Sequence, residues 1–127
     1  MVTAVETRMP EGSRGSGVLF ADSARMRVHM VGIGGAGMIA AACLLRDMGS
    51  YVSGSDLSAF EGLGALVGSG VRVSIGHHES QLDADVELVV ASAAVPETNS
   101  ELIIARRLGI PVIKYAELLG SLMALCE

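Results

Sequence analysis

Short and longer apolar runs alternate along the chain from Met26 onward, and this alternation predicts its secondary structure. The run at 71–75 alternates apolar and polar residues, whereas the run at 86–91 is almost wholly apolar, as in a strand covered on both faces. The short runs predict strands at 27–31, 51–55, 71–75, 86–91 and 110–114. The longer ones predict helices at about 37–48, 57–67, 99–108 and from 115 towards the C-terminus.

The order of these elements predicts the fold class. Strands that alternate with helices through short connections form a parallel sheet with right-handed crossovers. We therefore expect an α/β, Rossmann-like, doubly wound domain at 25–127, with a five-stranded parallel sheet in the order 3-2-1-4-5 and helices on both faces. Ligands of such sheets bind where the strand order reverses, here between the first and fourth strands. Residues 1–24 contain a Gly- and Ser-rich stretch and are expected to form a flexible extension.

A glycine-rich loop joins the first predicted strand to the first predicted helix. Gly32, Gly34 and Gly37 have the G-x-G-x-x-G spacing, and Met38 follows them directly. Glycines in this pattern allow a tight turn and a close approach of backbone amides to an anion at the helix start. The pattern therefore predicts a phosphate site. Taken alone, it indicates a dinucleotide.

Composition and charge narrow the class of protein. With 50% hydrophobic and 18% charged residues, the chain should fold around a core. The net charge of −5 disfavours a nucleic-acid partner. The sequence shows neither a secretory leader nor an apolar run long enough to span a membrane, so we expect a cytoplasmic protein without a membrane partner. Cys43 and Cys126 lie far apart in apolar contexts and should be free thiols, and no metal-ligand spacing is present.

Several polar residues follow the predicted strands at the edge where a ligand would bind. Asp56 lies about 20 residues beyond the glycine loop, where an acidic residue binds ribose hydroxyls, although Asp there also caps helices. His77 is either a ligand-binding or a solvated loop residue. Ser92 and Ala93 end the fourth strand opposite the glycine loop. His29, within the first strand, should be a hydrogen-bonded core residue.

Together these segments resemble the N-terminal domain of the Mur ligases of peptidoglycan synthesis, and among them the ligases that add L-alanine to UDP-N-acetylmuramate. The resemblance runs from about Met26 to the C-terminus. It is carried by Val31-Gly32-Ile33-Gly34-Gly35-Ala36-Gly37-Met38, Val52-Ser53-Gly54-Ser55-Asp56-Leu57, Ile75-Gly76-His77, Ala91-Ser92-Ala93-Ala94-Val95-Pro96 and Gly109-Ile110-Pro111-Val112.

The resemblance implies a function for the glycine loop. In the family this domain binds the UDP of UDP-N-acetylmuramate, ATP activates the lactyl carboxylate, and the amine of L-alanine attacks the acyl phosphate. The backbone of Gly34 to Met38 would then hold the diphosphate. The residues implied to contact this substrate are Gly32, Gly34, Gly35, Ala36, Gly37, Met38, Ser55, Asp56, His77, Ser92 and Ala93.

The sequence departs from the whole family enzyme at its end. The family's ATP loop would follow directly after Glu127, and no G-x-x-x-x-G-K-[ST] motif occurs in the chain. We therefore expect an isolated substrate-binding domain, inactive alone, with ATP and Mg²⁺ bound by a missing central domain and the amino-acid site completed by a missing C-terminal domain. The alternatives are an NAD(P)-binding domain of a dehydrogenase or redox-sensing regulator, and a domain kept for protein contacts.

Overall fold

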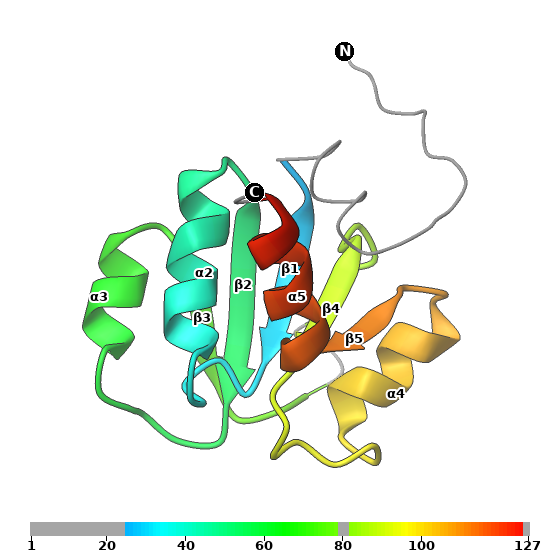
Figure 1. The fold of residues 1–127 in the computed structure, drawn as a ribbon. Helices are drawn as coiled ribbons and strands as arrows, with labels where there is room; N and C mark the ends of the chain where they lie inside the picture. Colours follow the sequence, from blue (N-terminus) through cyan, green and yellow to red (C-terminus); the bar gives the residue numbers. More distant parts are fainter. Residues whose placement is uncertain (1–24, 79–81, 126–127) are drawn as a thin grey trace.

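The computed structural model describes residues 25–78 and 82–125. It contains a five-stranded sheet in the order β3-β2-β1-β4-β5, with every pair parallel (Figure 1). This confirms the predicted topology. The strands are β1 (Arg27–Val31), β2 (Tyr51–Asp56), β3 (Arg72–Ile75), β4 (Leu88–Ala91) and β5 (Val112–Lys114). The predicted extension at 1–24 and Cys126 lie outside the described residues.

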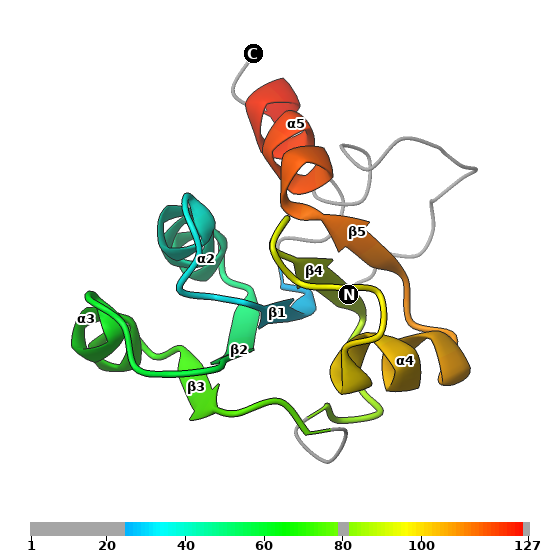
Figure 2. The same cartoon turned by 90° about the horizontal axis from the view of Figure 1, so that it is seen from below.

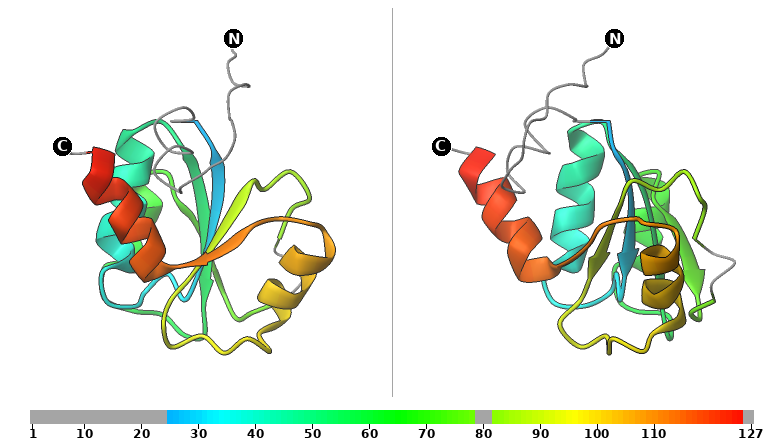
Figure 3. Two further views of the ribbon diagram at one scale, coloured as in Figure 1. Left: turned by 45° about the vertical axis from the view of Figure 1, so that its right-hand side comes forward. Right: turned by 90° about the vertical axis from the view of Figure 1, so that its right-hand side faces the viewer.

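Helices cover both faces of the sheet. They are α2 (Met38–Asp47), α3 (Leu63–Gly68), α4 (Ser100–Arg107) and α5 (Tyr115–Leu125). Seen along the sheet, α2, α3 and α5 lie on one face and α4 lies on the other (Figures 2 and 3). Right-handed crossovers explain the positions of α2, α3 and α4, because the chain steps outwards from β1 in one direction and then from β4 in the other. The last helix, α5, follows β5 and packs in the same core as α2.

The two faces have separate apolar cores because successive strand residues point to opposite sides. On β1, Val28 and Met30 pack with residues of α2 and α5, whereas Val31 packs on the other face with residues of α4. Leu45 of α2 and Leu102 of α4 are fully buried, one in each core. Both cores hold the central strands in place and so set the position of the loops at their ends.

The second predicted helix is wrong over its first half. Only Leu63–Gly68 is helical, and the residues from Leu57 to Gly62 form an irregular loop. Gly62 has a φ of 98°, which is not helical, and Leu57 is 74% exposed. The loop lies beside the glycine-rich turn, where its side chains pack against the turn instead of continuing a helix.

The remaining boundaries agree with the sequence pattern to within a residue or two. Asn99 caps α4 by accepting from the amides of Glu101 and Leu102. Among the described residues, no helix has the length and apolar character that a membrane span requires.

The packing of α2 provides a test of the fold. Leu45→Ala, which empties a fully buried position, should lower the free energy of unfolding by about 2–5 kcal/mol. Leu44→Ala, next to it and 40% exposed, should cost about 1 kcal/mol or less. Urea denaturation followed by circular dichroism measures both. Equal losses for the two variants would contradict the assigned burial.

Candidate binding site at the carboxyl edge of the sheet

The loops that follow β1, β2, β3 and β4 meet at one edge of the sheet, onto which Figure 2 looks. A cavity of about 390 Å³ opens between them. It lies where the strand order reverses, between β1 and β4, as the topology predicts. Its walls are formed by Gly32, Gly34, Gly35, Asp56, Leu57, Ser58, Phe60, His77, Ser92, Ala94, Val95, Pro96 and Asn99.

The glycine loop uses most of its own amides to hold its shape. The amides of Gly32 and Ile33 donate to the Ser55 carbonyl, and that of Gly35 donates to the Gly32 carbonyl. The Met38 amide donates to the Gly35 carbonyl. Within the described residues the amides of Ala36 and Gly37 have no partner, and both residues are exposed at the start of α2. An anion would therefore meet these two donors at the positive end of the helix.

Glycine is the only residue type that fits at position 37. It precedes α2 with a φ of 80°, and an added Cβ would fall on the hydroxyl of Tyr115. Tyr115 begins α5 directly after β5, so the turn that precedes α2 meets the start of α5 here. The close neighbour of Gly37 is thus an aromatic ring from α5.

Asp56 braces the glycine loop from the end of β2. Its Oδ2 accepts from the Gly34 amide at 2.8 Å, and its Oδ1 accepts from the Leu57 amide at 2.8 Å. The alternative that Asp56 caps the second helix is wrong, because that helix begins at Leu63 after Gly62. The ring of Phe60 covers Gly34, where an added Cβ would lie 2.5 Å from Phe60 Cγ.

Some of the residues predicted to contact the ligand line the cavity, and the others lie beside it or are buried behind it. Gly32, Gly34, Gly35, Asp56, His77 and Ser92 line the cavity. Ala36, Gly37 and Ala93 are exposed beside it, while Met38 and Ser55 are fully buried and contribute no exposed side-chain surface. Met38 belongs to the core, and Ser55 acts through its hydrogen bonds.

Glu101 forms a buried polar network behind this cavity. Its Oε1 accepts from His29 Nε2 at 2.8 Å and from Ser55 Oγ at 2.7 Å. Its Oε2 accepts from the His78 amide at 2.9 Å and lies 3.6 Å from His77 Nδ1. The side chain of Glu101 is 0% exposed and that of His29 is 2% exposed. The prediction that His29 is a hydrogen-bonded core residue is confirmed.

The sequence contains little sign that Glu101 is buried. An acidic residue in the first turn of a helix is ordinary, and Glu101 fits the capped start of α4. The available signal is His29, because a histidine inside an apolar strand requires a partner that the local sequence does not supply.

Burial would raise the pKa of Glu101, but its hydrogen bonds outweigh burial and hold the pKa below the usual value. Those bonds come first from His29 and then from Ser55 and the His78 amide. The first turn of α4 also favours a negative charge there. Glu101 is therefore a buried carboxylate.

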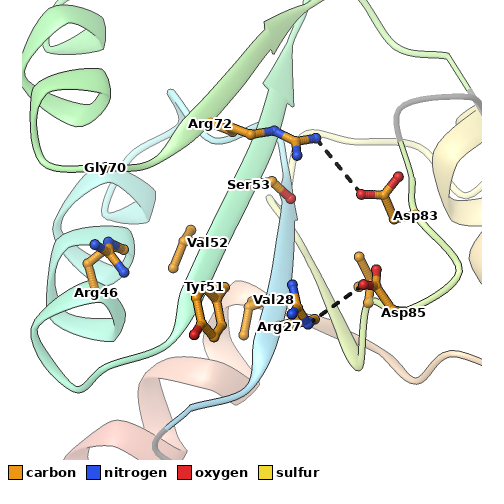
Figure 4. A pocket seen from close by; sticks show the side chains of 11 residues that line it. Arg27, Val28, Arg46, Tyr51, Val52, Ser53, Gly70, Arg72, Asp83 and Asp85 are labelled. Atoms are coloured by element: carbon orange, nitrogen blue, oxygen red, sulfur yellow. Dashed lines mark ion pairs between the residues drawn. The ribbon is translucent and has the colours of Figure 1, made fainter.

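A second cavity of about 260 Å³ lies at the opposite edge, where β1, β2 and β3 begin (Figure 4). Arg27 stacks over the Tyr51 ring at 4.8 Å and faces Asp85 at 3.7 Å. Arg72 faces Asp83 at 4.0 Å. These charges are exposed and paired, and the cavity shares no residue with the one at the glycine loop. Within the described residues no group of His, Cys, Asp and Glu could hold a metal ion.

The fold and the cavity define a Rossmann-like α/β domain with a candidate anion site at the turn after β1. Comparison with known proteins gives the family. The family described as "Mur ligase family, catalytic domain" matches residues 27–126, and the chain belongs to it.

Individual relatives agree with this assignment. The chain is 52% identical over 101 residues to UDP-N-acetylmuramate–L-alanine ligase of Mycolicibacterium gilvum, covering 76% of this chain and 21% of that one. It resembles the crystal structure of UDP-N-acetylmuramate–alanine ligase from Thermotoga maritima, with a TM-score of 0.75 and 29% identity over 79% of this chain and 23% of that one. A murein peptide ligase from Psychrobacter arcticus has a TM-score of 0.64 at 27% identity, over 68% and 18%. The chain thus spans about a fifth of the length of its curated relatives.

The buried carboxylate predicts a pH dependence of stability. A carboxyl group whose pKa is lower in the folded protein stabilises the fold above the unfolded-state pKa, and this contribution is lost as pH falls through the folded value. The free energy of unfolding should therefore decrease as the pH is lowered below about 4.5, the unfolded-state pKa of Glu101. Glu101→Gln should be less stable by about 1–3 kcal/mol at neutral pH and should show a flatter slope.

Urea denaturation between about pH 7 and about pH 3 measures this slope. Glu97→Gln is the control. The pKa of Glu97 is also held low, first by its hydrogen bond to Lys114 and then by Arg106 and Lys114 charges, but its carboxylate is exposed and screened by water. If Glu97→Gln flattened the pH dependence of the unfolding free energy and Glu101→Gln left it unchanged, the result would contradict the assignment of Glu101 as the stabilising buried carboxylate.

Proposed function

We propose that this chain binds the UDP part of UDP-N-acetylmuramate at the carboxyl edge of the sheet. The observation that carries the proposal is the cavity between β1 and β4, which the glycine loop lines next to two unpartnered amides. The similarity to UDP-N-acetylmuramate–L-alanine ligases includes this loop and supports the choice of ligand.

Each part of a nucleoside diphosphate has a matching group in this site. The diphosphate would accept from the amides of Ala36 and Gly37, because a helix start favours an anion. The ribose and the base would lie in the cavity near Asp56, His77 and Ser92. Phe60 and Val95 provide apolar surface there for a planar base.

The reaction of a whole ligase of this family would need an ATP-binding loop in addition to a substrate site. A ligase of this type adds L-alanine to UDP-N-acetylmuramate for peptidoglycan synthesis, with ATP and Mg²⁺ bound in a central domain. The 127 residues contain no G-x-x-x-x-G-K-[ST] loop to hold ATP. We therefore propose that they hold the substrate in the cytoplasm, catalyse nothing alone, and act with the ATP-binding and C-terminal domains of the same enzyme, without nucleic acid or membrane.

The position of Asp56 is also compatible with a dinucleotide ligand. Dinucleotide-binding domains use a carboxylate at the end of the second strand to contact ribose. In the structure this carboxylate accepts from the Gly34 amide and stabilises the loop. This arrangement is available to either ligand, so the choice between them falls to a binding measurement.

The first binding prediction separates these ligands. Calorimetric titration of the chain should give a saturable heat with UDP-N-acetylmuramate at up to millimolar concentration, and UDP should compete for the same site. NADH should give no such heat and no change in its fluorescence. Tight NADH binding without a response to UDP-N-acetylmuramate would favour the dinucleotide alternative, and binding of neither would favour a domain that serves protein contacts.

The second binding prediction concerns the glycine loop. Gly34→Val should lower the affinity for UDP-N-acetylmuramate at least tenfold, by roughly 1.4 kcal/mol, because the new side chain displaces the Phe60 ring from the cavity wall. The circular dichroism spectrum should remain nearly unchanged.

Gly64→Val is the matched control. Gly64 lies in α3, away from the cavity, with open space where a Cβ would be. This variant should bind as the unmodified chain does. Unchanged affinity in Gly34→Val, with wild-type affinity in the control, would count against a ligand at this loop.

A further inference from the structure

Proton positions in the buried network follow from the chemistry of its members. Ser55 Oγ lies 2.7 Å from Glu101 Oε1 and 2.9 Å from His77 Nδ1. A carboxylate can only accept, so the single hydroxyl proton of Ser55 is donated to Glu101. Ser55 Oγ must then accept from His77, which places the ring proton of His77 on Nδ1.

The same reasoning gives His29 the opposite tautomer. His29 Nε2 lies 2.8 Å from Glu101 Oε1 and therefore carries a proton, while Nδ1 accepts from Ser53 Oγ at 2.8 Å. The other carboxylate oxygen accepts from the backbone amide of His78. One buried carboxylate thus orders the protons of two histidines.

His77 is the member of this network that reaches the cavity. It lines the cavity wall, and Nδ1 is turned towards Ser55. Nε2, on the far edge of the ring, has no hydrogen-bond partner among the described residues. With the proton held on Nδ1, Nε2 has a free lone pair.

We propose that Glu101 is a positioning residue which, through Ser55, holds the proton of His77 on Nδ1 and presents Nε2 to the cavity as a hydrogen-bond acceptor. The ligand group that this nitrogen selects is an N–H or O–H donor, such as the imide of a uracil ring or a sugar hydroxyl. A phosphate oxygen would face a lone pair and is disfavoured. The statement about the ligand rests on the proposed function, whereas the statement about the tautomer does not.

A single substitution should invert the proton order. In Glu101→Gln, the amide oxygen must face the backbone amide of His78, since the alternative places two donors against each other. The new NH₂ group then faces Ser55 and His29 and donates to both. Ser55 would turn its proton towards His77 Nδ1, and the ring proton of His77 would move to Nε2.

Long-range ¹H–¹⁵N correlation spectra of the ligand-free chain at about pH 8 test this directly, because protonated and unprotonated ring nitrogens differ in ¹⁵N shift. The chain has three histidines, which His77→Gln and His78→Gln variants assign. We expect Nδ1–H for His77 in the wild type and Nε2–H in Glu101→Gln. Ser53→Ala is the control, since Ser53 contacts the network only at His29, and it should leave the His77 tautomer unchanged.

Two outcomes of the spectra overturn the positioning role. One is an Nε2–H tautomer of His77 in the wild type, an outcome that does not depend on whether Glu101→Gln folds. The other is an unchanged His77 tautomer in a folded Glu101→Gln. A shift of the His77 tautomer in Ser53→Ala would likewise contradict the pathway through Ser55.

Binding measurements test the ligand part separately. Glu101→Gln should lower the affinity for UDP roughly tenfold, because Nε2 becomes a second donor facing the ligand's donor. The 3-methyl analogue of UDP lacks the imide N–H. If the imide is the donor, the wild type should bind this analogue roughly tenfold more weakly than UDP, and if a sugar hydroxyl is the donor, it should bind both equally well. An inverted His77 tautomer in Glu101→Gln with unchanged affinity for UDP would refute the statement about the ligand. Absence of UDP binding to the wild type would refute the proposed function, whereas the spectra would still test the positioning role of Glu101.

Discussion

The buried carboxylate of Glu101 is the interaction on which the architecture of the ligand edge depends. It extends from α4 on one face of the sheet and binds side chains of β1 and β2 and the backbone after β3. Burying an ionised group costs free energy unless its oxygens are hydrogen-bonded. The partners of Glu101 must therefore keep their positions relative to one another. The loop that carries His77 is consequently attached to the sheet although it follows the short strand β3 at the edge of the sheet.

The glycine loop is held by a second set of contacts from different elements. Asp56 accepts from the Gly34 amide, Phe60 covers Gly34, and Tyr115 contacts Gly37 from α5. The loop therefore has its shape before any ligand is present, and the conformational entropy of ordering it is already lost on folding. Its remaining unpartnered amides, at Ala36 and Gly37, face outward at the start of α2, next to the cavity. Under the proposed function, these two amides would donate to a nucleoside diphosphate without further ordering of the loop.

Membership of the Mur ligase family fits this division between a rigid loop and an open cavity. The chain covers only about a fifth of the length of the ligases that it resembles, so it corresponds to the part of such an enzyme that carries this edge. The curated relatives compared above carry the name UDP-N-acetylmuramate–L-alanine ligase, and the murein peptide ligase shares the fold at a lower TM-score than the ligase from Thermotoga maritima. Under the proposed function, the residues described here would hold the substrate, and its activation would need an ATP-binding loop, for which the 127 residues contain no motif.

The sequence by itself determined the topology and the edge of the sheet at which the cavity opens. Apolar periodicity depends on local geometry, and the glycine spacing depends on a turn within a few residues, so both can be read along the chain. The helix expected at 57–67 was wrong in its first half because Phe60 packs against Gly34, a contact that local propensity does not contain. Glu101 looked like an ordinary helix-start residue, and Ser55 like a ligand contact. Only the tertiary structure decided that both are buried and that they hydrogen-bond to His29 and His77, because hydrogen bonds between residues up to 72 positions apart exist only once the sheet has assembled.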